Sequence, residues 1–87
     1  MTMRHQLTDT PVNAGLANGR YYLHNIGLRT ANFQEKSGAG AATPPTDQSN
    51  SDRLLPGEKH EIRIQAGDHL YVWADSSTTL VIGPTSA

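Results

Sequence analysis

The chain has 87 residues, no cysteine and a formal net charge of −1, with seven Lys and Arg against eight Asp and Glu. Its 36% hydrophobic and 17% charged content predicts at most one, rather polar, domain. The lack of cysteine excludes disulfides, thiolate metal sites and a cysteine nucleophile. Because there is no basic run and no long apolar stretch, we expect neither nucleic acid nor a membrane as partner, and a soluble chain without an export signal.

Residues 1–18 combine Thr, Asp, Pro, Asn and Gly with three spaced apolar residues, Leu7, Val12 and Leu16. This spacing predicts an extended N-terminal arm whose apolar side chains anchor in a neighbour's groove. A frayed terminus is the alternative. We therefore expect an arm over 1–18 followed by a single β domain over 19–87.

The first strand is expected after the Asn18-Gly19 turn, where residues 20–26 are rich in aromatic and branched side chains and end at Gly27. A second strand is predicted over 28–35, with Phe33 as its main core residue. Residues 37–53 then lack any aromatic or large aliphatic side chain. They predict a mobile polar surface loop, or alternatively a segment that a partner orders.

The second half of the chain shows clearer strand patterns. Pro56-Gly57 predicts a type II turn, and residues 60–65 alternate apolar and polar side chains. Further strands are expected over 70–74 and 79–82, separated by turn signals. No segment has a helical apolar period. These patterns predict an all-β fold, a small antiparallel β-sandwich or open barrel.

Candidate catalytic and metal-binding residues are few. The four histidines are His5, His24, His60 and His69. Two ligands on one strand must be two residues apart to share a face, and no His-X-His or His-X-Glu occurs. The serines fall in predicted turns, loops or the tail, outside any Gly-X-Ser-X-Gly elbow. We expect no enzyme, no metal and no cofactor.

The small size of the expected core is the main functional clue. Without the arm, the polar loop and the last five residues, 47 residues remain to build a core. Domains near or below about 40 residues generally need disulfides, metals or oligomerisation to stay folded. Since the first two are not expected, the chain is predicted to be a homo-oligomer, a trimer or dimer, or to dock on a larger assembly.

The large aromatic residues are expected in the core and at the interfaces of this assembly. The residues that we predict at interfaces are Leu7, Val12, Leu16, Tyr22, Tyr71 and Trp73. A stacking platform for carbohydrates or bases is the alternative use of the aromatic side chains.

Several segments together resemble small β-rich virion proteins of tailed bacteriophages, most of all head decoration or cement proteins. The segments that carry this resemblance are 21–27, the Pro-Gly-Glu turn within 54–58, Ile62, Ile64, the Ala-Gly-Asp turn 66–68, the aromatic strand 70–74, and 79–82. They cover about two-thirds of the chain.

The resemblance implies a non-enzymatic protein that binds the outside of an assembled icosahedral capsid and stabilises it against internal pressure. The implied partner is the major capsid protein or another virion protein, and the implied location is the virion, assembled in the host cytoplasm. No catalytic residue carries over. A carbohydrate- or receptor-binding β module of a phage fibre or tail stays open as the alternative function.

Overall fold

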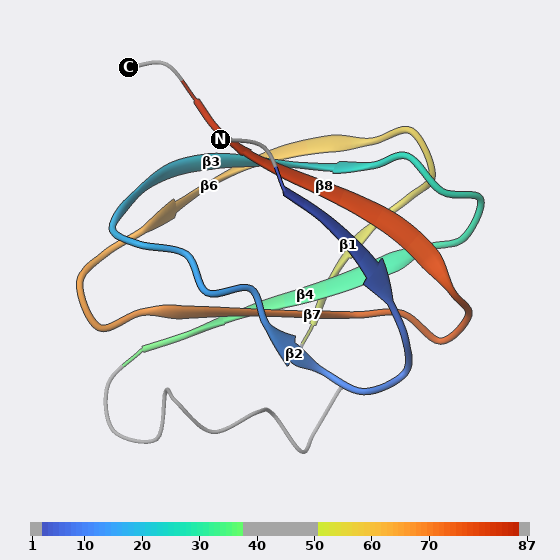
Figure 1. The fold of residues 1–87 in the computed structure, drawn as a ribbon, viewed down its shortest axis with the longest axis horizontal. Helices are drawn as coiled ribbons and strands as arrows, with labels where there is room; N and C mark the ends of the chain where they lie inside the picture. The colour runs from blue at the N-terminus through green and yellow to red at the C-terminus, as the bar shows by residue number, and fades with distance from the viewer. Residues whose placement is uncertain (1–2, 38–50, 86–87) are drawn as a thin grey trace.

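The computed structural model describes residues 3–37 and 51–85, and this part of the chain contains eight β-strands and no helix. The strands are β1 (Met3–Leu7), β2 (Val12–Asn13), β3 (Gly19–Asn25), β4 (Ala31–Lys36), β5 (Asp52–Leu54), β6 (Lys59–Ile64), β7 (His69–Trp73) and β8 (Thr78–Pro84). They form two four-stranded antiparallel sheets (Figure 1). We call the sheet with the order β1-β8-β3-β6 sheet A and the sheet with the order β2-β7-β4-β5 sheet B.

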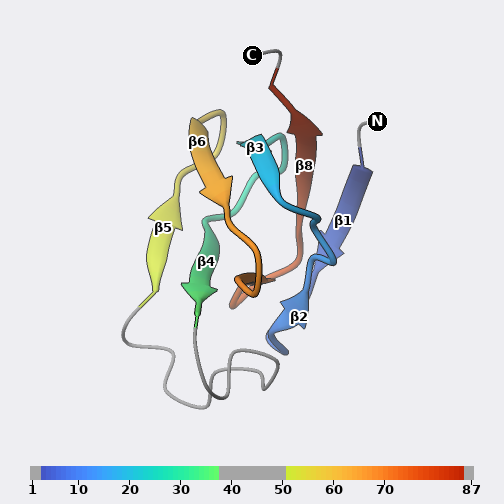
Figure 2. The same cartoon turned by 90° about the vertical axis from the view of Figure 1, so that its left-hand side faces the viewer.

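The strand pairing is nested. β4 pairs with β5, β3 with β6, β2 with β7 and β1 with β8, all antiparallel. Such nesting is obtained when one long β-ribbon folds over so that its strands alternate between two sheets, which is the jelly-roll topology. The edge strands β5 and β6 lie on one side of the molecule, and β1 and β2 lie on the other (Figure 2). The predicted all-β sandwich is therefore confirmed.

The core lies between the two sheets and is built by strand alternation. On each strand every second side chain faces the other sheet, as with Leu70 and Val72 of β7, which are completely buried. The remaining fully or nearly fully buried aliphatic residues of this core include Leu23, Ile64, Leu80 and Ile82. Burial of each such side chain contributes about 1.5–3 kcal/mol to the hydrophobic stabilisation of the fold.

The described part of the predicted N-terminal arm belongs to the sandwich, which corrects the expectation of an arm outside the β domain. β1 pairs with β8 from Met3 opposite Ile82 to Leu7 opposite Thr78, and β2 pairs with β7. Leu7 and Ala14 lie in the core. The physical reason is that β7 and β8 would otherwise expose unpaired backbone N–H and C=O groups, which residues 3–13 satisfy. The estimate of 47 core-forming residues was therefore too small.

The predicted boundaries around the polar loop also change. Residues 38–50 of this loop lie outside the described residues, whereas residues 52–54 form β5 and pair with β4. The strand predicted over 28–35 begins only at Ala31, because residues 26–30 form the β3–β4 loop. The other predicted strands agree with β3, β6, β7 and β8 to within two residues at each end.

The turns before β6 and β7 have the same hydrogen-bond pattern. In the first, Gly57 has φ of +84°, as a type II turn requires, and the Glu58 N–H donates to the Leu55 carbonyl over 3.0 Å. The Glu58 carboxylate in turn accepts a hydrogen bond of 2.6 Å from the Leu55 N–H. Residues 65–68 repeat this pattern with Gly67 and Asp68. The predicted Pro-Gly turn is thus confirmed.

Candidate functional site

Three loops meet at one end of the sandwich, on the right-hand side of Figure 1. They are the β3–β4 loop (26–30), the β5–β6 turn (55–58) and the β7–β8 turn (74–77), and we call them together the loop end. Three of the four exposed large hydrophobic residues in the described part of the chain lie here. Exposed apolar residues that gather on one rigid surface are typical of binding sites.

The loop end is organised by Asn25, the last residue of β3, whose side chain is completely buried. Its Nδ2 group donates to the Arg29 carbonyl over 2.6 Å and to the Leu54 carbonyl over 2.9 Å. Its Oδ1 atom accepts from the Gly27 N–H over 3.1 Å and from the Thr78 hydroxyl over 3.0 Å. An asparagine side chain has two donor hydrogens and two acceptor lone pairs, so its hydrogen-bonding capacity is fully used.

The backbone of Asn25 reinforces this arrangement. Its N–H donates to the Glu58 carbonyl over 3.1 Å, and its carbonyl accepts from the Gly57 N–H over 2.7 Å. Beside it, Gly27 approaches β8 so closely that an added Cβ would lie 1.9 Å from the Thr78 Oγ1. The three loops are therefore fixed to one another before any partner binds, which lowers the entropy cost of binding.

The apolar tips of the loop end point into solvent. Leu28 is 89% exposed, Leu55 is 54% exposed and Ile26 is 42% exposed. The Ile26 N–H donates to the Thr79 carbonyl over 3.1 Å, which anchors to β8 the loop that carries Ile26 and Leu28. Apolar residues on rigid loops, in contact with water, are candidates for contact with another protein.

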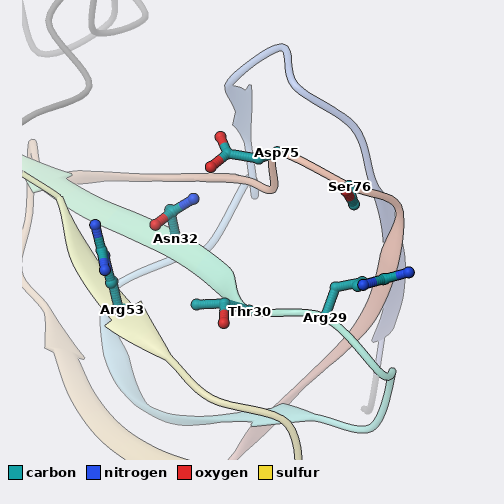
Figure 3. A pocket seen from close by; sticks show the side chains of 6 residues that line it. All are labelled: Arg29, Thr30, Asn32, Arg53, Asp75 and Ser76. Carbon is teal, nitrogen blue, oxygen red and sulfur yellow. The ribbon is translucent and has the colours of Figure 1, made fainter.

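A polar hollow of about 230 Å³ lies next to these tips (Figure 3). Its lining residues are Arg29, Thr30, Asn32, Arg53, Asp75 and Ser76. Figure 3 shows the Arg53 guanidinium near the Asn32 amide, whereas the Arg29 guanidinium points away from both. Neither guanidinium forms an ion pair within the described ranges 3–37 and 51–85.

The chemistry of this hollow is that of recognition. It offers guanidinium, amide, hydroxyl and carboxylate groups for hydrogen bonds, but no histidine lines it. A serine hydroxyl needs an adjacent base to act as a nucleophile. The carboxylate of Asp75 lines the same hollow, but Figure 3 shows it directed away from Ser76. The hollow can therefore hold a polar group of a partner.

The six residues predicted at interfaces occupy different environments. Leu7 lies in the core, and the partly buried Leu16 packs against it. Val12 is 49% exposed on β2, and Tyr22 is half-buried on the outer face of sheet A. The structure does not bring these four residues together into one surface.

Tyr71 and Trp73 require a correction. They alternate with the core residues of β7 and lie on its other face, yet they are only 0% and 1% exposed. A side chain that is buried within its own chain cannot anchor a partner, so neither is an accessible interface residue. The expectation that both faces of β7 are covered is confirmed.

The histidines do not form a centre in the structure. His60 stacks at a tilt on Phe33, with ring centroids 5.3 Å apart, and His69 Nδ1 lies 3.1 Å from the Asn13 amide. The buried Nε2 of His5 has no hydrogen-bond partner in the described part of the chain. Within residues 3–37 and 51–85, no group of three or more His, Asp or Glu side chains has a geometry that fits a metal ion.

Among the residues that the structure describes, one carboxyl group has a shifted pKa, and it lies away from the loop end. Partial burial raises the pKa of Glu35 on β4, and the neighbouring carboxylates of Asp68 and Asp52 raise it further, whereas His60 lowers it. Like charges that share a site favour the protonated form. We therefore assign the raised pKa of Glu35 first to its partial burial and then to repulsion by Asp68 and Asp52.

Comparisons with protein-family models, with curated protein sequences and with solved structures find no match to this chain. Within the two described ranges, the structure contains no helix with the length and apolar character needed to cross a membrane.

Sequence reasoning missed the residues that shape the loop end. An exposed leucine such as Leu28 looks the same in sequence as a core leucine, so no local signal distinguishes it. Asn25 had a weak signal: an Asn at a strand end, two residues before a Gly, is typical of a side chain that bonds the backbone ahead of it. Its bonds to Leu54 and Thr78 span 29 and 53 residues and had no local signal.

Proposed function

We propose that this chain is a non-enzymatic structural protein that binds the outside of an assembled bacteriophage capsid and stabilises it, acting as an oligomer. The single observation that carries the proposal is the loop end, whose loops are held in place by Asn25. It exposes the apolar side chains of Ile26, Leu28 and Leu55 beside the polar hollow. The sequence resemblance to small virion proteins supports the same function. The jelly roll is compatible with it, since this topology is common in viral capsid domains, although a topology alone does not define a function.

The loop end suits contact between copies of the chain. Its apolar tips are accompanied by both signs of charge, with Arg29 and Arg53 beside Glu58 and Asp75. Cyclic oligomers bring the same surfaces of different copies together around an axis. The basic residues of the loop end on one copy can then pair with the acidic residues of the loop end on the next copy. Apolar tips beside residues of both charge signs therefore favour a subunit contact, in a dimer or trimer.

The alternative of a carbohydrate-binding module has lost part of its support. Sugar rings stack on exposed aromatic faces, and the predicted platform comprised Tyr21, Tyr22, Tyr71 and Trp73. Of these four residues, Tyr71 and Trp73 are buried. Hydrogen-bonding groups in the hollow of Figure 3 remain available to a polar ligand, but no aromatic side chain lines it.

The location is tested by quantitative mass spectrometry of purified intact phage particles. We expect the chain at a fixed copy ratio to the major capsid protein, and a ratio that survives repeated gradient purification. Stripping the chain should lower the temperature at which the particles lose their genome. Particles that lack the chain, or that keep their thermal stability without it, would refute the proposed function.

The subunit contact is tested separately by sedimentation of the isolated protein. Leu28→Ser with Leu55→Ser should convert an oligomer into a folded monomer, because the apolar tips are removed while the core is untouched. Val12→Ser is the matched control, since it removes an exposed apolar side chain away from the loop end. A wild-type protein that stays monomeric at micromolar concentration would contradict the oligomeric part of the proposal.

A further inference from the structure

The outer face of sheet A gathers positive charge that is scattered in the sequence. Strand alternation places four exposed cations on this face, namely Arg4 of β1, Arg20 of β3, and Lys59 and Arg63 of β6. They are four of the seven Lys and Arg residues, and Glu61 is the one acidic residue among the strand positions of this face. The face therefore carries an excess of three positive charges in a chain whose net charge is −1.

The cations on this face are placed where they repel one another. Arg20 lies directly opposite Arg63 in the β3–β6 register. Like charges in direct cross-strand positions destabilise a sheet. Neither of the two guanidinium groups forms an ion pair within the described part of the chain. An anionic partner that binds this face would neutralise the like charges and remove their destabilising effect.

A tyrosine lies among these cations. The ring of Tyr22 covers Gly83, since a Cβ added at that glycine would be 2.6 Å from the ring. The Nζ atom of Lys59 lies 5.6 Å from the ring centroid. Tyr22, Lys59 and Glu61 also line an open hollow of about 480 Å³. The face thus combines a half-buried tyrosine ring with arginine guanidinium groups. Tyrosine and arginine are enriched among the residues that contribute most of the binding energy at protein interfaces.

We propose that the outer face of sheet A is a docking surface for an acidic protein surface, with Arg20, Arg63 and Lys59 around Tyr22 as its contact residues. The inference rests on the proposed function, because it names the chemistry of the partner on which the oligomer sits. Guanidinium groups bind carboxylates through two parallel hydrogen bonds, which fixes orientation as well as charge. In this arrangement the loop end joins the copies, and the basic face binds the shell.

Charge and shape favour this occupant over the others. A second copy in a symmetric, face-to-face contact would present the same positive face and would be repelled. An anionic bilayer is bound most firmly when apolar side chains insert into it, and Val81, the one large aliphatic residue on this face, is buried. Nucleic acid binding relies on a continuous phosphate track with several stacking bases, whereas this face carries one tyrosine and an acidic residue beside it.

The test uses the full chain and three probes, namely poly-L-glutamate, a 20-nucleotide single-stranded oligo-dT, and vesicles that contain phosphatidylserine. The variant is Arg20→Gln with Arg63→Gln. The matched control is Thr10→Glu with Ala17→Glu, which changes the net charge by the same two units at exposed loop positions. Circular dichroism of each variant checks the fold, and the Arg20→Gln, Arg63→Gln variant should be at least as stable as wild type because repulsion is removed.

We expect wild type and control to bind poly-L-glutamate, and the Arg20→Gln, Arg63→Gln variant to bind about tenfold more weakly, with binding that weakens as salt is added. Equal binding by variant and wild type would overturn the inference, as would tighter binding of oligo-dT or of the vesicles. If the chain is absent from particles but binds poly-L-glutamate through this face, only the proposed function fails. If the variant still binds particles like wild type, only this inference fails.

Discussion

The side chain of Asn25 offers the sharpest test of how the loop end is held. Asn25→Ala removes all four of its side-chain hydrogen bonds, of which those to Leu54 and from Thr78 are buried and the other two are partly buried. A buried polar group without a partner costs about 1–3 kcal/mol, and a partly buried one costs less because water reaches it. The free energy of unfolding should therefore fall by roughly 3–5 kcal/mol.

Such a loss is a large part of the 5–15 kcal/mol or so that stabilises a typical domain. Since a domain of this size loses about 4–8 °C in Tm for each kcal/mol, the Tm should fall by roughly 12–40 °C. Urea unfolding measures the change, with the fluorescence of Trp73, the single tryptophan, as the probe. Asn13→Ala is the matched control, because Asn13 also bonds an N–H two residues ahead but is exposed.

Asn25→Asp tests the direction of the hydrogen bonds. The substitution keeps an acceptor for Gly27 and Thr78, but it turns a carboxylate oxygen toward the Arg29 and Leu54 carbonyls. This environment raises the pKa of the introduced carboxyl group, so the variant should recover stability as the pH falls through that raised pKa and the group becomes protonated. An Asn25→Ala variant within about 1 kcal/mol of wild type, or an Asn25→Asp variant without pH dependence relative to wild type, would refute the reasoning.

Three further substitutions follow from the same structure. Trp73→Ala should lower the free energy of unfolding by about 3–5 kcal/mol, because the side chain is 1% exposed; a wild-type melting curve by circular dichroism would contradict its burial. Gly27→Ala should cost about 1–3 kcal/mol, since the new Cβ would meet Thr78 and the Thr79 nitrogen, which is 2.7 Å away and part of the backbone; an unchanged urea midpoint would show that the loop has room. Glu35→Gln should raise the Tm at pH 7 by up to about 3 °C, because a raised folded-state pKa means that the ionised carboxylate destabilises the fold; the side chain is mostly exposed, which keeps the effect small. That difference from wild type should shrink as the pH falls through the folded-state pKa and vanish below about pH 4, where the glutamate is protonated in both states; a difference that grows toward low pH would contradict the sign.

The strands that carry strong alternation could be predicted from the sequence. In β6 and β7, apolar residues such as Ile62, Ile64, Leu70 and Val72 recur at every second position, because one face of each strand must be buried. β1 escaped prediction because its inward positions hold Met3 and His5 before Leu7, so its pattern is weakly apolar. β2 and β5, with two and three residues, are too short to give a pattern.

The candidate surfaces could be predicted only in part. That aromatic residues matter was foreseen, but burial separates Trp73, which stabilises the fold, from Tyr22, which stays accessible on sheet A. Because the sequence contains no basic run, no positively charged surface was predicted from it. A sheet does not need such a run, since alternation and pairing bring residues 20 and 63 into direct register.

The sequence by itself determined that this is an all-β chain with tight Pro-Gly and Ala-Gly turns and without cysteine chemistry, because turn propensity, strand alternation and composition are local properties. Only the tertiary structure decided that residues 3–13 complete the two sheets, that Asn25 ties three loops into one end, and that four scattered cations share one face. These features depend on contacts between residues that lie tens of positions apart along the chain. Pairing across the sandwich creates them, and no local stretch of sequence contains them.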